Sequence, residues 1–310
     1  MTSHQPLNSV RAALFGLALL LGPAAPAMAQ NAASPAPVSR AEGQGPAMWI
    51  VRDADSTLYL FGAMHLLRPD ASWGSERLDR ALDSASRLIL EVATPADQTV
   101  LDPLIRQYGV SPDRPLSSLL TAEEIAVLDA AARTVGATAA DLDPMRPWLA
   151  GVPVQSASIL RQGYAAEAGV ETVLQARAEA AGIPVSGFET PEDQIRMLSG
   201  FPEEGQVAYL RRSLQEFGAE QTELDRLVTA WSTGDVETIR VLSVEPLRAN
   251  SDLLYQALLV RRNTNWADQI ETLLEGSGAI FIAVGAMHLA GDDSVQEILR
   301  ARGVAVERVP

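Results

Sequence analysis

The chain has 310 residues, with 39 acidic against 24 basic side chains and a formal net charge of −15 at pH 7. This charge argues against nucleic acid or an anionic membrane surface as a partner. Every basic residue is arginine and there is no cysteine, which excludes a Schiff-base or P-loop lysine, thiol catalysis, thiolate metal ligands and disulfides.

The first 29 residues have the pattern of a secretory signal peptide. Arg11 closes a short amino-terminal region, an apolar stretch follows, and small residues precede a cleavage point after Ala29. The uninterrupted apolar part is shorter than the ~20 residues that a membrane span needs. We therefore expect a periplasmic or secreted protein without a membrane span after cleavage. Residues 30–46 are rich in Ala, Pro, Ser and Gly, and we expect a flexible linker there.

The remaining residues, 47–310, suit one large domain or two closely packed ones. Two β-rich runs, 47–53 and 57–63, predict a hairpin with a polar turn between them. Residues 75–86 have helical spacing and lead into a short apolar strand over 87–92.

The middle of the chain is mostly helical by its pattern, over about 95–165 and 191–275. Thr121 and Glu124 predict a capping box at the start of one helix. Between the two helical regions, a helix over 169–182 feeds a strand over 183–189. The carboxyl-terminal part then predicts a strongly apolar strand over 278–288, a helix over 292–303 and a last strand over 304–309. Strands at both ends with helices between them predict an α/β domain that carries a helical insertion.

The pentapeptide GAMHL occurs twice, at 62–66 and 285–289, and each copy ends an apolar run. The chain has three histidines, and the third, His4, lies in the predicted signal peptide. Every histidine of the mature protein would then belong to a copy of this pentapeptide. A lone histidine after a strand is more often structural than a ligand, but the repetition favours a functional pair, His65 and His288.

Four predicted strands end in a possible ligand or acid–base group, namely His65, Glu91, Glu189 and His288. Ligands of open α/β sheets bind in the crevice beyond the carboxyl ends of the strands, so we expect these groups to meet there. We expect the glycine of each GAMH to let the chain turn as it leaves the sheet. Two imidazoles and two carboxylates suit a divalent metal such as Mn, Co, Fe or Zn. A carboxylate that is not a ligand could serve as general base.

These segments resemble the TraB/GumN family, which includes the Tiki proteins and is marked by paired G-x-x-H motifs. The resemblance rests on residues 58–67 and 283–309, which contain the two GAMHL copies, and on residues 88–92, 169–194 and 261–274. It implies an α/β fold with a mixed sheet, related to erythromycin-esterase and ChaN-like domains. From the Tiki branch it also implies a metal-dependent protease that favours Mn or Co.

The resemblance also carries over site residues. His65 and His288 match the paired histidines, and Glu91 and Glu189 match two acids of the family. Arg262 and Asn263 match an Arg-Asn pair that would orient a substrate or bind a carboxylate. The family pattern Gly-x-Asp reads Gly-x-Glu at residues 169–171, and we do not place that glutamate among the site residues.

The leading interpretation is an exported metallohydrolase, most plausibly a metallopeptidase that uses metal-activated water. Its metal ligands would come from His65, His288, Glu91 and Glu189, and its catalytic groups from the two glutamates, Arg262 and Asn263. Two alternatives use the same residues. One is a periplasmic protein that binds a metal or haem without turnover, and the other is a metal-free His/Glu hydrolase of the erythromycin-esterase kind. The sequence defines neither the peptide or small-molecule substrate nor the oligomeric state.

Overall fold

The computed structural model describes residues 38–95, 98–217 and 222–310. The predicted signal peptide and the first eight residues of the predicted linker lie outside the described residues. Within the described ranges, no helix combines the length and the apolar character that a membrane span requires.

A six-stranded mixed sheet forms the centre of the described chain, in the order β4-β3-β5-β2-β1-β6. Neighbours among β4, β3, β5 and β2 are parallel, whereas β1 pairs antiparallel with both β2 and β6. This arrangement confirms the predicted α/β class and places the carboxyl ends of the four parallel strands at one edge of the sheet. The strands are β1 (Met48–Arg52), β2 (Ser56–Ala63), β3 (Arg87–Val92), β4 (Val185–Glu189), β5 (Gly278–Gly285) and β6 (Val306–Arg308).

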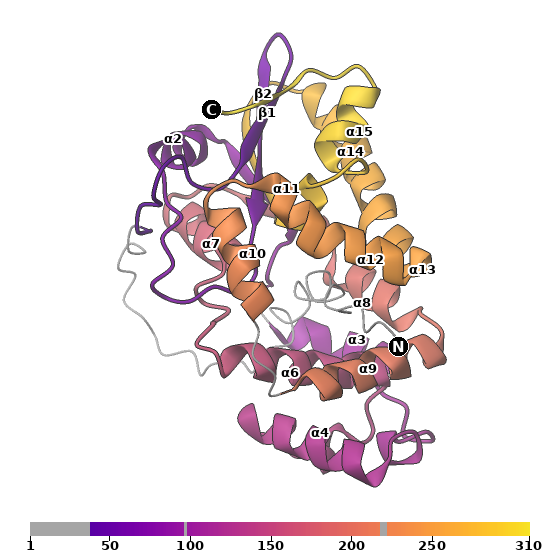
Figure 1. Cartoon of the computed structure of the whole chain (residues 1–310). Helices are drawn as coiled ribbons and strands as arrows, with labels where there is room; N and C mark the ends of the chain where they lie inside the picture. The colour runs from indigo at the N-terminus through magenta and orange to yellow at the C-terminus, as the bar shows by residue number, and fades with distance from the viewer. Residues whose placement is uncertain (1–37, 96–97, 218–221) are drawn as a thin grey trace, which may run out of the picture.

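Helices cover both faces of this sheet (Figure 1). On one face, α14 and α15 bury Trp266, Ile270 and Leu299 against the apolar side chains of β1, β2 and β5. On the other face, α2 and α7 bury Leu78, Leu82 and their neighbours against β3 and β5. The helices named so far are α2 (Glu76–Ser84), α7 (Val170–Ala180), α14 (Arg261–Leu274) and α15 (Val295–Ala301).

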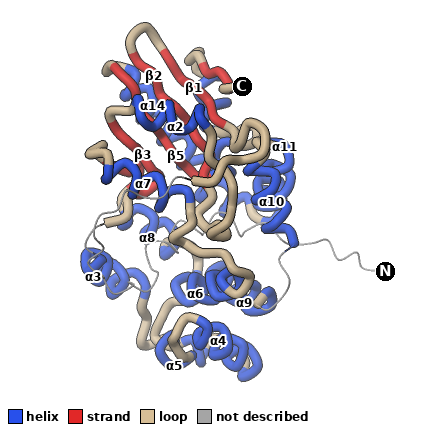
Figure 2. Tube along the Cα trace, turned by 90° about the vertical axis from the view of Figure 1, so that its left-hand side faces the viewer, coloured by secondary structure: helices blue, strands red, loops and turns tan. Residues whose placement is uncertain are grey.

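The predicted helical middle forms a second layer beyond one end of the sheet. Helices α4, α6 and α9 lie together away from the strands in both views (Figures 1 and 2). They share a small apolar core of their own, which includes Leu128, Val154 and Leu210. The remaining α-helices are α3 (Asp102–Leu104), α4 (Ala122–Thr134), α5 (Ala139–Leu142), α6 (Pro147–Leu160), α8 (Pro191–Ser199), α9 (Glu203–Glu216), α10 (Thr222–Ser232), α11 (Val236–Ile239), α12 (Glu245–Asn250) and α13 (Asp252–Tyr255).

Local sequence signals account for several element boundaries. The predicted capping box begins α4, where the Thr121 hydroxyl accepts from the Glu124 amide and the Glu124 carboxylate accepts from the Thr121 amide. Asp53 makes the hairpin turn, because its Oδ1 accepts from the Ser56 amide at 2.8 Å.

Residues 38–46, in the predicted linker, lie against the domain. The Ala41 amide donates to Gly74 O at 2.9 Å, and Arg77 Nη2 donates to Pro46 O at 2.6 Å. One backbone and one side-chain hydrogen bond thus hold the described end of that segment beside α2.

The two copies of GAMHL begin side by side in the sheet because β2 and β5 are parallel neighbours. Their register is offset by one position, since Ala63 pairs with Gly285. Beyond the sheet the two copies differ. After β2 the chain bends at His65, and Leu67 then exchanges backbone hydrogen bonds with Ala165. After β5 the chain turns at once into a short 3₁₀ helix, Ala286–Leu289.

Candidate metal and polar site

The carboxyl edge of the parallel strands collects the four side chains that the sequence predicted for this crevice. His65 follows β2 by two residues, Glu91 is the penultimate residue of β3, and Glu189 is the last residue of β4. His288 lies in the 3₁₀ turn that follows β5. Helix α14 adds Arg262 and Asn263 from its first turn, together with Trp266 one turn further on.

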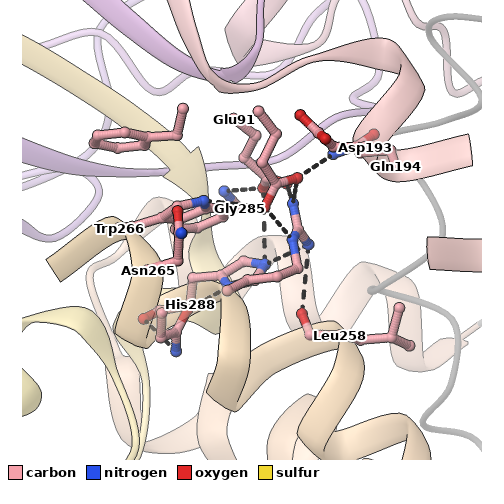
Figure 3. A network of polar contacts seen from close by, with 12 residues as sticks. Glu91, Asp193, Gln194, Leu258, Asn265, Trp266, Gly285 and His288 are labelled. Atoms are coloured by element: carbon pink, nitrogen blue, oxygen red, sulfur yellow. Dashed lines mark hydrogen bonds and ion pairs between the residues drawn. The ribbon is translucent and has the colours of Figure 1, made fainter. Parts of the chain in front are cut away.

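Glu91 lies at the centre of the network, with its two oxygens facing different partners (Figure 3). Oε1 accepts from Arg262 Nη2 at 2.5 Å, and Oε2 accepts from the Gly285 amide at 2.7 Å. Oε2 also lies 3.8 Å from His65 Nε2 and 3.9 Å from His288 Nε2. Burial alone would raise the pKa of this carboxyl, but the charge and hydrogen bond of Arg262, together with the two neighbouring histidines, hold the pKa well below its usual range. Glu91 is therefore a buried carboxylate.

Glu189 is surrounded by donors. Arg262 donates to it through Nε at 2.7 Å and Nη2 at 2.9 Å, while Trp266 Nε1 donates at 3.0 Å and Gln194 Nε2 at 3.2 Å. Four hydrogen bonds occupy the lone pairs that a metal ligand or a general base would need. In this arrangement Glu189 holds Arg262 in place.

Asn263 fixes the tautomer and orientation of His288. Its Nδ2 donates to Asp293 O at 2.7 Å, so its Oδ1 is the atom that faces His288 Nδ1 at 2.6 Å. His288 therefore carries its proton on Nδ1. Its Nε2 accepts from Arg262 Nη1 at 3.2 Å, and its ring lies 4.5 Å from that of Trp266. Burial, together with the charge of Arg262, lowers the pKa of His288 to about 3 despite the nearby Glu91 carboxylate, so the imidazole is neutral.

His65 has a partner that the sequence reading did not include. Glu171, in the first turn of α7, brings Oε1 to 2.7 Å from His65 Nδ1. Both side chains are buried; Glu171 Oε1 pairs with the imidazole, and within the described structure no hydrogen-bond donor reaches Glu171 Oε2. One ligand-type atom each from His65, Glu91 and Glu171 lie within 4.8 Å of one another. We call these three residues the ligand cluster.

The six predicted site residues are thus linked by direct contacts, but only His65 and Glu91 belong to the ligand cluster. His288 is hydrogen-bonded to Arg262 and Asn263 instead. Glu189 accepts hydrogen bonds mainly from Arg262. The missed residues are Glu171 and Trp266. Trp266 had a usable signal, because it follows Arg262 by one helical turn and so shares its helix face.

The chain does turn after Gly285, but glycine is needed at the site because neighbouring atoms come close to the backbone and not because the turn requires it. Gly285 has φ −49°, and a Cβ there would lie 2.8 Å from Glu91 Oε2 and 3.4 Å from His65 Nε2. A Cβ at Gly62 would lie 3.2 Å from Ala286 Cα, and one at Gly169 would lie 2.1 Å from His65 O. These positions need glycine because atoms of the site or its supporting backbone occupy the space.

Comparison with known proteins places the chain in a family. A model of the TraB/PrgY/gumN family matches residues 47–308, nearly all of the described chain. The chain belongs to this family. Other proteins similar to this TraB/PrgY/gumN chain include YbaP of Escherichia coli K12, with 24% identity over 255 residues that cover 82% of this chain and 92% of YbaP. YbaP of Shigella flexneri matches with the same identity and coverage. A protein of Treponema pallidum is 26% identical over 82% of this chain and 80% of its own length. No solved structure matches the chain significantly.

Proposed function

We propose that this TraB/PrgY/gumN protein is an exported metal-dependent hydrolase whose cation is held by His65, Glu91 and Glu171. The observation that carries the proposal is the buried cluster itself, in which His65 Nδ1 lies 2.7 Å from Glu171 Oε1, Glu91 lies close by, and Glu171 Oε2 has no donor within the described structure. Leaving the buried Glu171 Oε2 without a partner costs about 1 to 3 kcal/mol, and more because the group is charged. A cation in the cluster, together with a water molecule bound to it, would give all three side chains a partner.

The donor set fits a transition metal. One imidazole and two carboxylates suit Mn, Co, Fe or Zn, and fewer than six protein ligands leave positions for water and substrate. A divalent cation bound there would act as a Lewis acid and lower the pKa of a water molecule towards neutrality. The carboxyl edge of a parallel sheet is also where ligands of α/β proteins bind.

The other residues of the site would position the ligands and accept a proton. Arg262 and the Gly285 amide fix the Glu91 carboxylate, so that its Oε2 faces the ligand cluster. Glu171 Oε1 could act as a ligand beside His65, while Oε2, which no donor reaches within the described structure, could accept a proton from water. His288 stays neutral, with the proton on Nδ1 held by Asn263.

The substrate is proposed to be a peptide, on the resemblance of the chain to the Tiki branch of its family. Export to the periplasm or beyond is proposed from the signal-like pattern of residues 1–29.

The charge state of His65 argues against the metal-free hydrolase. Burial would lower the pKa of His65, but the charges of Glu171 and Glu91 outweigh it and raise the pKa to about 9. Without a metal, that imidazole is protonated at neutral pH and is a poor general base.

The test compares Glu171→Gln with Glu167→Gln, which makes the same change at an exposed position four residues earlier. Elemental analysis of the purified wild type and of Glu167→Gln should give metal, whereas Glu171→Gln should lose at least nine-tenths of it. Activity on a peptide library should vanish with a chelator and return with Mn or Co. Activity that ignores the chelator would support the metal-free hydrolase, and metal without turnover would support a binding protein.

A further inference from the structure

We propose that Arg262 takes the place of a second metal ion, so that the centre binds one divalent cation per chain. The inference rests on the proposed function and deepens it, because one-metal and two-metal hydrolases activate their substrates differently. In a two-metal site, ions about 3.5 to 4 Å apart stabilise the attacking and the leaving oxygen separately.

The guanidinium of Arg262 is surrounded by the kinds of atom that bind metals. Its Nη2 donates to Glu91 Oε1 at 2.5 Å and to Glu189 Oε2 at 2.9 Å. Its Nη1 lies 3.2 Å from His288 Nε2. These acceptors come from β3, β4 and the turn after β5, so three chain segments converge on one buried cation.

Glu91 joins this cation to the ligand cluster. One of its oxygens binds Arg262, and the other lies 3.8 Å from His65 Nε2. A carboxylate that bridges two neighbouring cations is a common arrangement in two-metal sites. Here one of the two bridged positions already holds a guanidinium.

Charge counting favours a single ion. Glu91, Glu171 and Glu189 contribute three negative charges, and Arg262 contributes one positive charge. One divalent ion then brings the cluster to neutrality, with His65 neutral as a ligand and His288 neutral by burial. A second divalent ion would leave an uncompensated charge of +2 in a buried site, which is strongly unfavourable. Arg262 cannot lose its proton to make room, because the guanidinium stays charged in proteins.

Removing the guanidinium should therefore admit a second ion. In Arg262→Met, an apolar side chain of similar length replaces the cation and leaves Glu91, Glu189 and His288 Nε2 without their shared partner. In the double variant Arg262→Met/Glu189→Gln, one negative charge and one ligand are also removed. We expect one Mn per chain in the wild type, two in the single variant and one again in the double variant.

The measurement is elemental analysis after the chelator-treated proteins are saturated with Mn and desalted, supported by titration calorimetry. Arg177→Ala is the matched control, since it breaks a partly buried ion pair with Asp79 far along α7 and should keep one Mn. Excess Mn should also raise the midpoint of thermal unfolding more in Arg262→Met than in the wild type, because two unpaired buried carboxylates gain a cation.

Two equivalents in the wild type would overturn the inference, and so would a single equivalent in a folded Arg262→Met. A wild-type protein that binds no Mn would instead contradict the proposed metal-dependent function. If Arg262→Met does not fold, the calorimetric stoichiometry of the wild type still decides, since two binding events per chain contradict a permanent guanidinium in the second position.

Discussion

At the residue scale, Gly285 controls how closely β5 approaches the Glu91 carboxylate. Its amide donates to Glu91 Oε2, and a Cβ would lie 2.8 Å from that same oxygen. We predict that Gly285→Ala folds, because the atoms in its way belong to movable side chains, but that Glu91 is pushed from its position. Metal affinity should fall by at least about tenfold, or about 1.4 kcal/mol.

The control for this change is Gly205→Ala in α9, where a Cβ would meet no atom within 4 Å. Alanine is a better helix former than glycine by about 1 kcal/mol, so this variant should bind metal normally and unfold at a slightly higher temperature. Calorimetric titration with Mn checks both. Unchanged affinity in Gly285→Ala would show that Glu91 does not hold the metal.

The sequence indicated some members of this site better than others. The repeated pentapeptide indicated His65 and His288 as site residues. Because each copy follows a strand, the sequence also predicted that the two histidines lie at the same edge of the sheet. It could not show that His288 Nε2 faces Arg262 while His65 faces Glu171, because these partners come from helices far away in the chain. Glu171 was missed because the family pattern has the shorter aspartate there. The structure brings α7 into the site through the Glu171–His65 contact and the close packing of Gly169 against His65 O.

At the element scale, α14 presents Arg262, Asn263 and Trp266 to the sheet edge. Trp266 also stacks on Phe188, with ring centroids 5.6 Å apart, and its Nε1 donates to Glu189 Oε1. We predict that Trp266→Phe keeps the ring packing but loses this hydrogen bond. The free energy of unfolding should fall by about 1 to 3 kcal/mol.

Denaturant unfolding measures this loss, and Trp231→Phe supplies a matched comparison. Trp231 is equally buried and its Nε1 donates to Gly62 O at 2.7 Å. Both variants should be destabilised to a similar extent. Only Trp266→Phe should alter metal affinity, because only its hydrogen bond holds the partner of Arg262. Equal metal affinity in both variants would contradict that link between α14 and the ligand cluster.

The conformation of the chain beyond the ends of the strands is not defined by the local sequence. Periodicity and capping signals predicted the hairpin, the parallel strands and most of the helices, because those signals act within a few residues. The two copies of GAMHL adopt different conformations although their sequences are identical. The first copy bends at His65 and leads into backbone pairing between Leu67 and Ala165, whereas the second copy turns into a 3₁₀ helix. Tertiary pairing rather than the pentapeptide decides the geometry beyond the sheet.

At the scale of the whole molecule, the two buried histidines set opposite pH dependences on the stability of the metal-free protein. The pKa of His288 falls from 6.5 to about 3 on folding, because burial disfavours its charged form. Between pH 3 and 6.5 the unfolded chain therefore binds more protons than the folded one, and stability falls as pH falls. The pKa of His65 rises from 6.5 to about 9 on folding, because its carboxylate neighbours outweigh burial. Between pH 6.5 and 9 the folded chain binds more protons, and stability falls as pH rises.

We therefore predict that the chelator-treated protein is most stable near pH 6.5. Each histidine changes the free energy of unfolding by at most about 1.4 kcal/mol per pH unit within its window. Urea unfolding from pH 5 to 9 measures both slopes. His65→Gln should remove the decline above pH 6.5 and leave the decline below it. Saturating Mn should remove the alkaline decline in the wild type, because a metal ligand has no proton to lose. A wild-type protein whose stability rises steadily from pH 6.5 to 9 without metal would contradict the assigned charge of His65.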